Sequence, residues 1–355
     1  CNKLVFSRPY NAVLIVPTGI GASIGGYAGD ALPLARAMAK ICDYLITHPN
    51  VLNGAQLYWP SSNILYVEGY GLDNFSCGNW GLDPVLSNRV GLILDQGIES
   101  DLMLRHIQAA NAARATLGLK LTDYIVTDAS LGVELRITNS GTSWGTISNP
   151  GSLLRAAEKL INIDRAEAIA VVSRFPDEID KTLLNNYRSG SGVDPIAGAE
   201  SVISHLIVSQ FCIPAAHAPA LNPLPLDSTI SPRSAAEELG YTFLSSVLVG
   251  LSRAPQFVTK QNFHSIWADD VDALVVPATA CGGSSVLSLN QRNSVLIAVA
   301  ENETAINVLP ESLKLKAITV NSYLEALGVL VAHKAGIDIN TIGLNLSSLS
   351  SLTER

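Results

Sequence analysis

"NAVLIVPTGIGASIGGYAGDALPLARAMAKI", residues 11–41, joins three patterns in one continuous stretch. An apolar run at 11–16 is followed by five glycines within residues 17–30, and then by apolar residues at helical spacing. A buried strand, a glycine-rich loop and a helix in this order are typical of α/β proteins, where such a loop often contacts a ligand. We therefore expect a strand, a ligand-binding loop and a helix in this stretch.

The same kind of apolar run recurs eight times further along the chain, each time ending in a polar or glycine-containing turn. The runs lie at residues 43–50, 64–69, 90–97, 123–130, 167–175, 247–253, 272–283 and 295–302. Apolar residues at helical spacing lie at 31–42, 99–117, 151–162, 196–209, 232–240 and 322–335. Because the runs are continuous rather than alternating, they indicate strands buried on both faces. We expect an α/β protein with mostly parallel sheets and flanking helices.

A proline-rich segment at 213–232 divides this pattern into two parts. So many prolines are unfavourable in a helix or a central strand, so we interpret the segment as a linker or crossover between two α/β lobes. The expected N-terminal lobe spans 9–212 and carries the glycine-rich loop, the C-terminal lobe spans 233–345, and residues 346–355 form a tail.

The composition narrows the possible partners. Hydrophobic residues make up 48% of the chain and charged residues only 15%, which favours a large core together with a subunit interface, and hence a homo-oligomer. No apolar stretch is long enough to span a membrane. The net charge of −8 and the lack of a basic block argue against a nucleic-acid partner. Five scattered cysteines without a CxxC pair predict neither a zinc site nor a disulfide framework.

The glycine-rich loop departs from the known nucleotide-binding patterns. Gly19 and Gly21 match the dinucleotide fingerprint, but Ile24 replaces its third glycine, and Asp30 would repel a pyrophosphate at the following helix. A G-K-[ST] motif is absent from the chain. We instead expect backbone N–H groups of the turn to bind a carboxylate or small oxyanion. The expected ligand-binding residues of the loop are Thr18, Gly19, Gly21, Gly25 and Gly26.

Polar side chains follow almost every predicted strand, where ligands bind in open parallel sheets. They are Thr18, His48, Glu68, Asp95, Asp128, Arg174, Arg253, Cys281 and Glu301. About half of them are expected to serve the structure as caps or turn formers. His48, Asp128 and the loop residue His217 are the candidate catalytic bases, and Arg174 is a candidate ligand contact. For both histidines, a hydrogen bond to the backbone of a turn is the structural alternative.

The segment "VVPATACGGSSVLSL", residues 275–289, places Cys281 in a turn before a predicted helix. A helix N-terminus stabilises a thiolate, so Cys281 is the candidate nucleophile or acid/base thiol. Gly282, Gly283 and Ser284 are expected to bind the ligand through their backbone N–H groups. The alternative is a small buried cysteine in a tight turn. Two G-x-S-x-G motifs, centred on Ser23 and Ser143, lack the strand-to-helix context of a nucleophile elbow.

Several long phrases resemble a domain-of-unknown-function family of cyanobacteria and plastid-bearing algae. Among them are "LITHPNVLNGAQLYWP" at 45–60, "VTDASLGVELRITNSGTSWGTI" at 126–147, "GVDPIAGAESVISH" at 192–205 and "YTFLSSVLVGLSRAPQFV" at 241–258. The resemblance covers about residues 9–335. It implies a photosynthetic organism and a cytoplasmic or plastid-stromal protein, which weighs against reading Cys1 as a lipoprotein cysteine. It brings no known activity, cofactor or catalytic residue with it.

Two functional hypotheses follow from the residues. The first is a soluble enzyme that acts on a small, anionic metabolite by hydrolysis or group transfer at a carbonyl, with its site at the carboxyl ends of the strands. The alternative is a non-catalytic ligand-binding or assembly protein. The polar residues at the predicted strand ends favour the enzyme.

Overall fold

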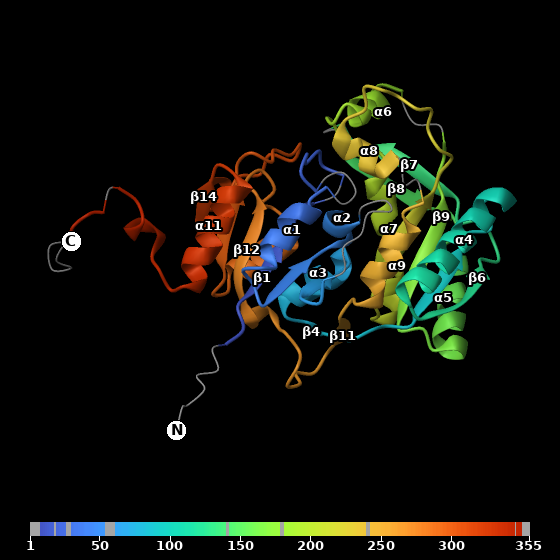
Figure 1. The fold of residues 1–355 in the computed structure, drawn as a ribbon, viewed down its shortest axis with the longest axis horizontal. Coiled ribbons are helices and arrows are strands. Elements are labelled where there is room, and N and C mark those ends of the chain that lie inside the picture. The colour runs from blue at the N-terminus through green and yellow to red at the C-terminus, as the bar shows by residue number, and fades with distance from the viewer. Residues whose placement is uncertain are drawn as a thin grey trace.

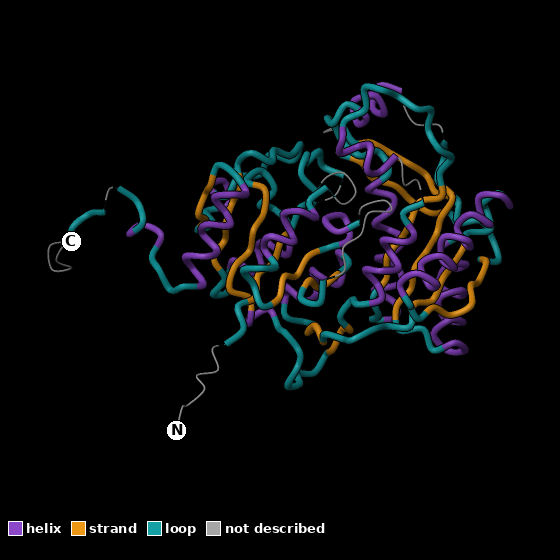
Figure 2. Tube along the Cα trace, in the orientation of Figure 1, coloured by secondary structure: helices purple, strands orange, loops and turns teal. Residues whose placement is uncertain are grey.

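Two parallel sheets, each covered by helices on both faces, make up the computed structural model (Figures 1 and 2). It describes residues 8–17, 19–25, 30–53, 61–139, 142–177, 181–238, 242–344 and 346–349. This architecture confirms the expected α/β class with mostly parallel sheets and flanking helices.

The first sheet has the strand order β14-β13-β12-β1-β2-β3, with every pair parallel. Its strands are β1 (Asn11–Leu14), β2 (Tyr44–Thr47), β3 (Ile64–Tyr66), β12 (Val271–Pro277), β13 (Val295–Val299) and β14 (Ala317–Val320). Helices α1 (Leu32–Met38) and α11 (Tyr323–Lys334) supply the apolar cluster on one face, and α3 (Gly69–Cys77) and α10 (Ser284–Asn290) supply that on the other.

The second sheet has the order β10-β9-β5-β6, again with every pair parallel. Its strands are β5 (Val90–Leu94), β6 (Leu121–Val126), β9 (Ala168–Arg174) and β10 (Ala215–Ala220). One face is covered by α4 (Ser100–Leu117) and α9 (Leu244–Ser252), and the other by α5 (Pro150–Asp164) and α7 (Ala197–Phe211). The antiparallel hairpin of β7 (Val133–Ile137) and β8 (Ser143–Ile147) packs on α7.

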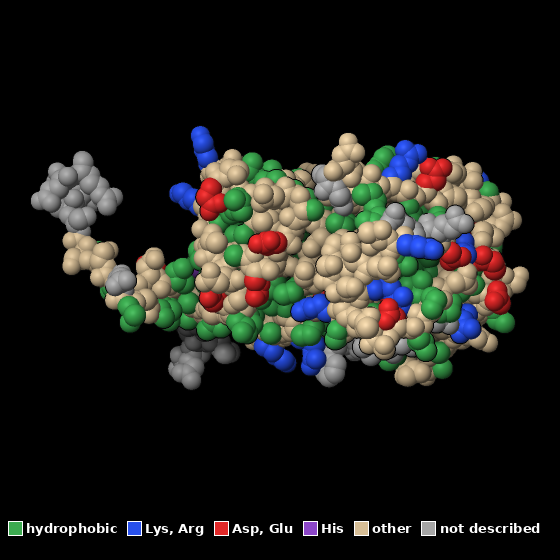
Figure 3. Space-filling model, turned by 90° about the horizontal axis from the view of Figure 1, so that it is seen from above, with side chains coloured by type: hydrophobic (Ala, Val, Ile, Leu, Met, Phe, Trp, Pro, Cys, Tyr) green, Lys and Arg blue, Asp and Glu red, His purple; other side chains and the backbone are tan. Residues whose placement is uncertain are grey.

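The remaining elements are short. They are α2 (Pro49–Leu52), β4 (Gly81–Asp83), α6 (Lys181–Arg188), α8 (Pro232–Glu238), β11 (Gln256–Val258) and the 3-10 helices η1 (Ala268–Asp270), η2 (Glu311–Leu313) and η3 (Ile339–Thr341). Within the described part of the chain, none of the helices combines the length and the apolar character needed to cross a bilayer. Seen from above, acidic and basic side chains are scattered rather than gathered into a patch of one sign (Figure 3).

Two elements differ from the sequence prediction. The run at 247–253, expected to be a strand, lies largely in helix α9, whose buried residues Leu244, Val247, Leu248 and Leu251 have helical spacing. Part of the proline-rich segment, 215–220, is strand β10. This strand tolerates a proline because it lies at the edge of its sheet.

The two sheets do not correspond to the two lobes predicted on either side of residues 213–232. The first sheet combines strands from residues 11–66 with strands from residues 271–320, whereas the second uses residues 90–220. The cause is the pairing of β1 with β12, which brings the last third of the chain back beside its beginning. The chain therefore leaves the first sheet after β3 by way of β4, and it returns by way of β11, which pairs with β4 in a separate two-stranded sheet.

Asn88 joins the two connections between the sheets, the one that follows β4 and the one that leads into β11. Its side-chain amide donates to the carbonyl oxygens of Leu251 and Ala254, both at 2.8 Å, and its backbone N–H donates to that of Ser252 at 2.7 Å. Its side-chain oxygen accepts from the Gln256 amide at 2.9 Å. Asn88 is only 1% exposed, so all four bonds lie away from water. Strands β4 and β11 pair antiparallel close by.

Replacing Asn88 by alanine should destabilise the protein strongly. The change removes the donor to the buried Ala254 carbonyl and one of the donors to the Leu251 carbonyl, and we expect a loss of about 2 to 4 kcal/mol in the free energy of unfolding. Urea denaturation of the variant measures this loss. Asn185→Ala on the exposed surface of α6 is the control, and we expect it to change stability little. A comparable, small effect of both substitutions would contradict the structural role given to Asn88.

Candidate functional site

A cavity of about 480 Å³ lies at the carboxyl ends of the first sheet, between this sheet and helix α7 of the second. Strands β1 and β12 are neighbours, and the chain continues from them to opposite edges of the sheet. Such a switch point leaves a crevice where open parallel sheets bind ligands. Residues after β1, β2, β3 and β12 all line the cavity. Its apolar wall includes Ile15, Leu72, Phe243, Ile306 and Val308.

Glu68 and His205 form an ion pair on one wall of the cavity. Glu68 follows β3 and is the N-cap of α3, where one carboxylate oxygen accepts from the backbone N–H groups of Tyr70 at 2.8 Å and Gly71 at 3.2 Å. Its other oxygen lies 2.5 Å from His205 Nδ1. Burial opposes protonation of His205, but the hydrogen bond and charge of Glu68 outweigh it and raise the pKa of this histidine. His205 Nδ1 also donates to the Ser201 carbonyl oxygen at 2.6 Å, so Nε2 is the ring nitrogen that these partners leave for a ligand.

A second polar group comes from α7 and the adjoining strand β10. Asp194 accepts from the N–H of Ile196 at 3.0 Å just before α7, and Glu200 lies in the first turn of that helix. Glu200 Oε2 lies 3.8 Å from His217 Nε2. Burial raises the pKa of Asp194 to about 6, and burial with the neighbouring Asp194 charge raises that of Glu200 well above its usual value.

His217 is uncharged in this setting. Burial and the neighbouring His205 lower its pKa to about 3, and its Nδ1 lies 3.1 Å from the Ser204 hydroxyl. Ser204 also donates to the carbonyl of Ser201 at 3.3 Å, so we assign the ring proton to Nδ1. His217 Nε2 then has a free lone pair toward Glu200. The sequence prediction placed His217 in a loop, and the structure places it in edge strand β10.

His48 lines the same cavity but is bound to the backbone. Its Nε2 accepts the N–H of Val16 at 2.9 Å, which leaves the proton of the neutral ring on Nδ1. Burial lowers the pKa of His48 to about 4. His48 therefore has the hydrogen bond to the backbone that was its structural alternative. At neutral pH its ring is uncharged and offers a hydrogen-bond donor, Nδ1–H, rather than a base.

The turn after β12 lines the cavity as well, through Gly282, Gly283 and Ser284. Cys281 itself points away from it. Its side chain is fully buried in the core, with Sγ 3.5 Å from the carbonyl oxygen of Ala278, and burial raises its pKa to about 11. The expected lowering of the thiol pKa is thus wrong, because desolvation of the thiolate dominates at this position.

The described glycines of the glycine-rich loop lie beside the cavity rather than in its wall, which Pro17 at the start of the loop does line. Gly19, Gly21 and Gly25 have φ values of +70°, +83° and +79°, which explains the glycines, but none of them lines the cavity. The Gly25 N–H donates to Asp30, and the Gly19 carbonyl accepts from the Ser143 N–H at 3.1 Å. The loop therefore contacts the hairpin of β7 and β8. Thr18 and Gly26 lie outside the described residues.

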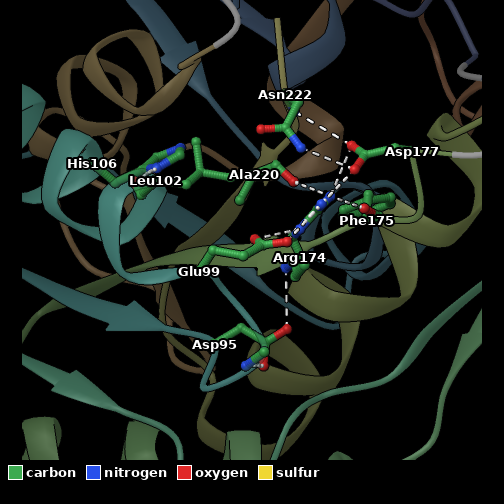
Figure 4. Close-up of polar contacts among 10 residues, drawn as sticks. Asp95, Glu99, Leu102, His106, Arg174, Phe175, Asp177, Ala220 and Asn222 are labelled. Carbon is green, nitrogen blue, oxygen red and sulfur yellow. Dashed lines mark hydrogen bonds and ion pairs between the residues drawn. The ribbon is translucent and has the colours of Figure 1, made fainter.

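Arg174 and Asp128 belong to the second sheet and lie outside the cavity. The Arg174 guanidinium bonds Glu99 at 2.8 and 2.9 Å and Asp177 at 3.0 and 2.5 Å, as Figure 4 shows. Asp128 is exposed and accepts from Arg155 at 2.7 and 2.8 Å, which with the Ser152 hydroxyl lowers its pKa. Both expected site residues thus have structural partners.

Four cavity residues were absent from the sequence-based site. Asp194, Glu200 and His205 fall within the stretch 192–205, and Glu68 was noted only as a polar strand end. The missed signal is the i, i+4 spacing of Glu200 with Ser204, and of Ser201 with His205, in a largely apolar helix. Among the described residues, no group of three His, Cys, Asp or Glu side chains is arranged to hold a metal ion.

Alkylation distinguishes buried from reactive cysteines. Because Cys281 and Cys42 are buried with raised pKa values, iodoacetamide should label them at least about tenfold more slowly than the exposed Cys77 and Cys212. Mass spectrometry of a timed reaction with the folded protein measures the four rates. Labelling of Cys281 as fast as that of Cys212 would restore it as a candidate nucleophile.

The comparisons with known proteins agree with the expected family. Residues 11–343 match the family described as "Protein of unknown function (DUF3326)". The chain is 56% identical over 336 residues, 94% of this chain and 93% of the relative, to an uncharacterized lipoprotein of the cyanobacterium Synechococcus sp.. That name does not fit the expected cytoplasmic or stromal location. No solved structure matches the chain. The chain belongs to the DUF3326 family of proteins of unknown function.

Proposed function

We propose that the protein is an enzyme that binds a small metabolite in the cavity and catalyses hydrolysis or group transfer at a carbonyl by general acid–base chemistry. The observation that carries this proposal is the grouping of Glu68, Glu200, His205 and His217 around one cavity at the switch point of the first sheet. The pKa values of Glu200 and His205 are raised and that of His217 is lowered, and such opposite shifts are the arrangement that acid–base catalysis needs.

His205 is the proposed general acid. The carboxylate of Glu68, 2.5 Å away, keeps the imidazolium form available near neutral pH and holds the ring in place. An imidazolium at the wall of a largely apolar cavity can donate a proton to a carbonyl oxygen or to a leaving group.

Glu200 and His217 form the second proposed catalytic group. Protonated Glu200 and neutral His217 lie 3.8 Å apart, so Glu200 can pass its proton to His217 Nε2 when the two side chains move within hydrogen-bond distance. With Cys281 buried in the core, attack by water or by the acceptor itself is favoured over a covalent enzyme intermediate.

A ligand-binding protein without catalysis is the second candidate. Glu68 and Asp194 accept backbone N–H groups at the starts of α3 and α7, and this capping gives both carboxylates a structural purpose without any reaction. The relative's description as a lipoprotein suits a ligand-binding protein anchored at a membrane as an alternative to the cytoplasm or stroma. Homo-oligomerisation remains part of the proposal, supported by exposed apolar residues such as Leu324 and Val331 on α11.

Turnover of metabolites tests the enzyme against the binding protein. The wild-type protein is incubated with a cyanobacterial metabolite extract, and mass spectrometry follows which compounds disappear and which form. Gly283→Phe fills open space in the cavity wall, so it should abolish any change, whereas Gly328→Phe on the exposed face of α11 should not. His205→Gln and Glu200→Gln should slow the reaction by about 10²- to 10⁴-fold.

The same series separates the two candidates. Compounds that co-purify with the wild type but not with Gly283→Phe, without any turnover, would support the binding protein and overturn the enzyme. Turnover that persists in Gly283→Phe would show that the reaction takes place elsewhere.

A further inference from the structure

The side chains around the cavity have an unbalanced charge. Four carboxyl side chains line it, Glu68, Asp73, Asp194 and Glu200, and so do His48, His205 and His217. Among the described residues that line it, none is Lys or Arg. At neutral pH two of the three histidines are uncharged, because burial lowers the pKa values of His48 and His217. The sequence-based expectation of an anionic ligand is therefore not favoured by this wall.

Two of the four carboxyl groups have partners within the protein. Glu68 is paired with His205 at 2.5 Å, and it also caps α3. Asp73 accepts from the Ser285 hydroxyl at 2.6 Å, next to the turn that follows β12. Asp73 is therefore satisfied without a ligand, whereas Glu68 Oε1 has no hydrogen bond and only its ion-pair contact with His205.

The other two carboxyl groups lack a cation. Asp194, which is 9% exposed, accepts backbone N–H groups at the start of α7, and Glu200 faces the neutral ring of His217. Within the described part of the chain, neither forms an ion pair with a Lys or Arg side chain. Asp194 is buried, Glu200 is partly buried, and the charge of Asp194 makes ionisation of Glu200 less favourable. A positive charge from a ligand would therefore be stabilised beside these two carboxyl groups.

The rest of the cavity wall is suited to an apolar body. Ile15, Leu72, Phe243, Ile306 and Val308 line the same space. A molecule with a cationic head and a compact apolar body would place the head against the two carboxyl groups and the body against these side chains. An anion would have the His205 imidazolium and, beyond it, uncharged donors such as His48, Asn50 and the turn at 282–284.

We propose that the ligand of this cavity is an amphipathic amine whose ammonium group is bound between Asp194 and Glu200. The inference rests on the proposed function, for which it names the substrate class. Binding of the ammonium group favours the ionised carboxylates, so a proton held by Glu200 is released to solvent when the ligand enters.

Three probes of nearly the same size and shape test this class: cyclohexylmethylamine, cyclohexylmethanol and cyclohexanecarboxylate. Isothermal titration calorimetry at pH 7 should give an affinity for the amine at least about tenfold higher than for the alcohol, and weaker binding still for the carboxylate. Titrations of the amine in two buffers of different ionisation enthalpy should also detect proton release.

Variants assign the selectivity to the two carboxyl groups. Glu200→Gln and Asp194→Asn should each reduce the preference for the amine over the alcohol, whereas Glu158→Gln on the exposed face of α5 should leave it unchanged. Gly283→Phe should weaken binding of all the probes that bind the wild type. Urea denaturation of each variant verifies that it is folded.

The outcomes separate this inference from the proposed function. Preferred binding of the alcohol or the carboxylate, lost in Gly283→Phe, would overturn the amine while leaving the cavity as the binding site. Binding of the amine that Gly283→Phe does not affect would overturn the assignment to this cavity. If none of the three probes binds, the amine inference is overturned, and metabolite turnover still tests the proposed function separately.

Discussion

The hydrogen bonds of Asn88 fix the two connections between the sheets to each other, and the cavity lies between elements of both sheets, where α3 packs against α7. Helix α7 belongs to the second sheet and α3 to the first, yet both contribute walls and charges to one cavity. Their relative position is set by the direct packing of α3 against α7 together with the connections that Asn88 joins. A fully satisfied, buried amide is suited to this role, because each of its bonds would be costly to break without a replacement partner.

The two sheets use their switch points in different ways. In the first sheet the carboxyl ends of β1 and β12 open into the cavity. In the second, β5 and β9 are the neighbours from which the chain diverges, and Asp95 accepts the N–H groups of Gly97 and Leu131 at 2.9 Å and of Arg174 at 3.1 Å there. The guanidinium of Arg174 extends the same network to Glu99 (Figure 4). One crevice is filled by protein groups and has a structural role, and the other remains available to a ligand.

The sequence predicted the fold class better than the site. Continuous apolar runs reveal buried parallel strands because burial on both faces is a property of each strand alone. A pKa depends instead on neighbours that only the fold supplies. Cys281 has the sequence context of a reactive thiol, yet the core around it raises its pKa. Glu68, Glu200 and His205 form a candidate site only because α3 packs against α7. No local sequence pattern predicts this contact. The run 247–253 was likewise mispredicted from local sequence, because a short apolar run suits a buried strand and a buried helix equally.

Infrared difference spectroscopy of the carboxyl groups tests the central claim most directly. The claim is that Asp194 and Glu200 face the cavity without a cation beside them, which makes it unfavourable for both carboxyl groups to be ionised. At pH 6 the wild-type protein should show the carbonyl band of a protonated, buried carboxylic acid, because burial raises the pKa of both groups. The band should weaken in Glu200→Gln and remain in Glu158→Gln. A spectrum without this band at pH 6, or a band that Glu200→Gln leaves unchanged, would contradict the account.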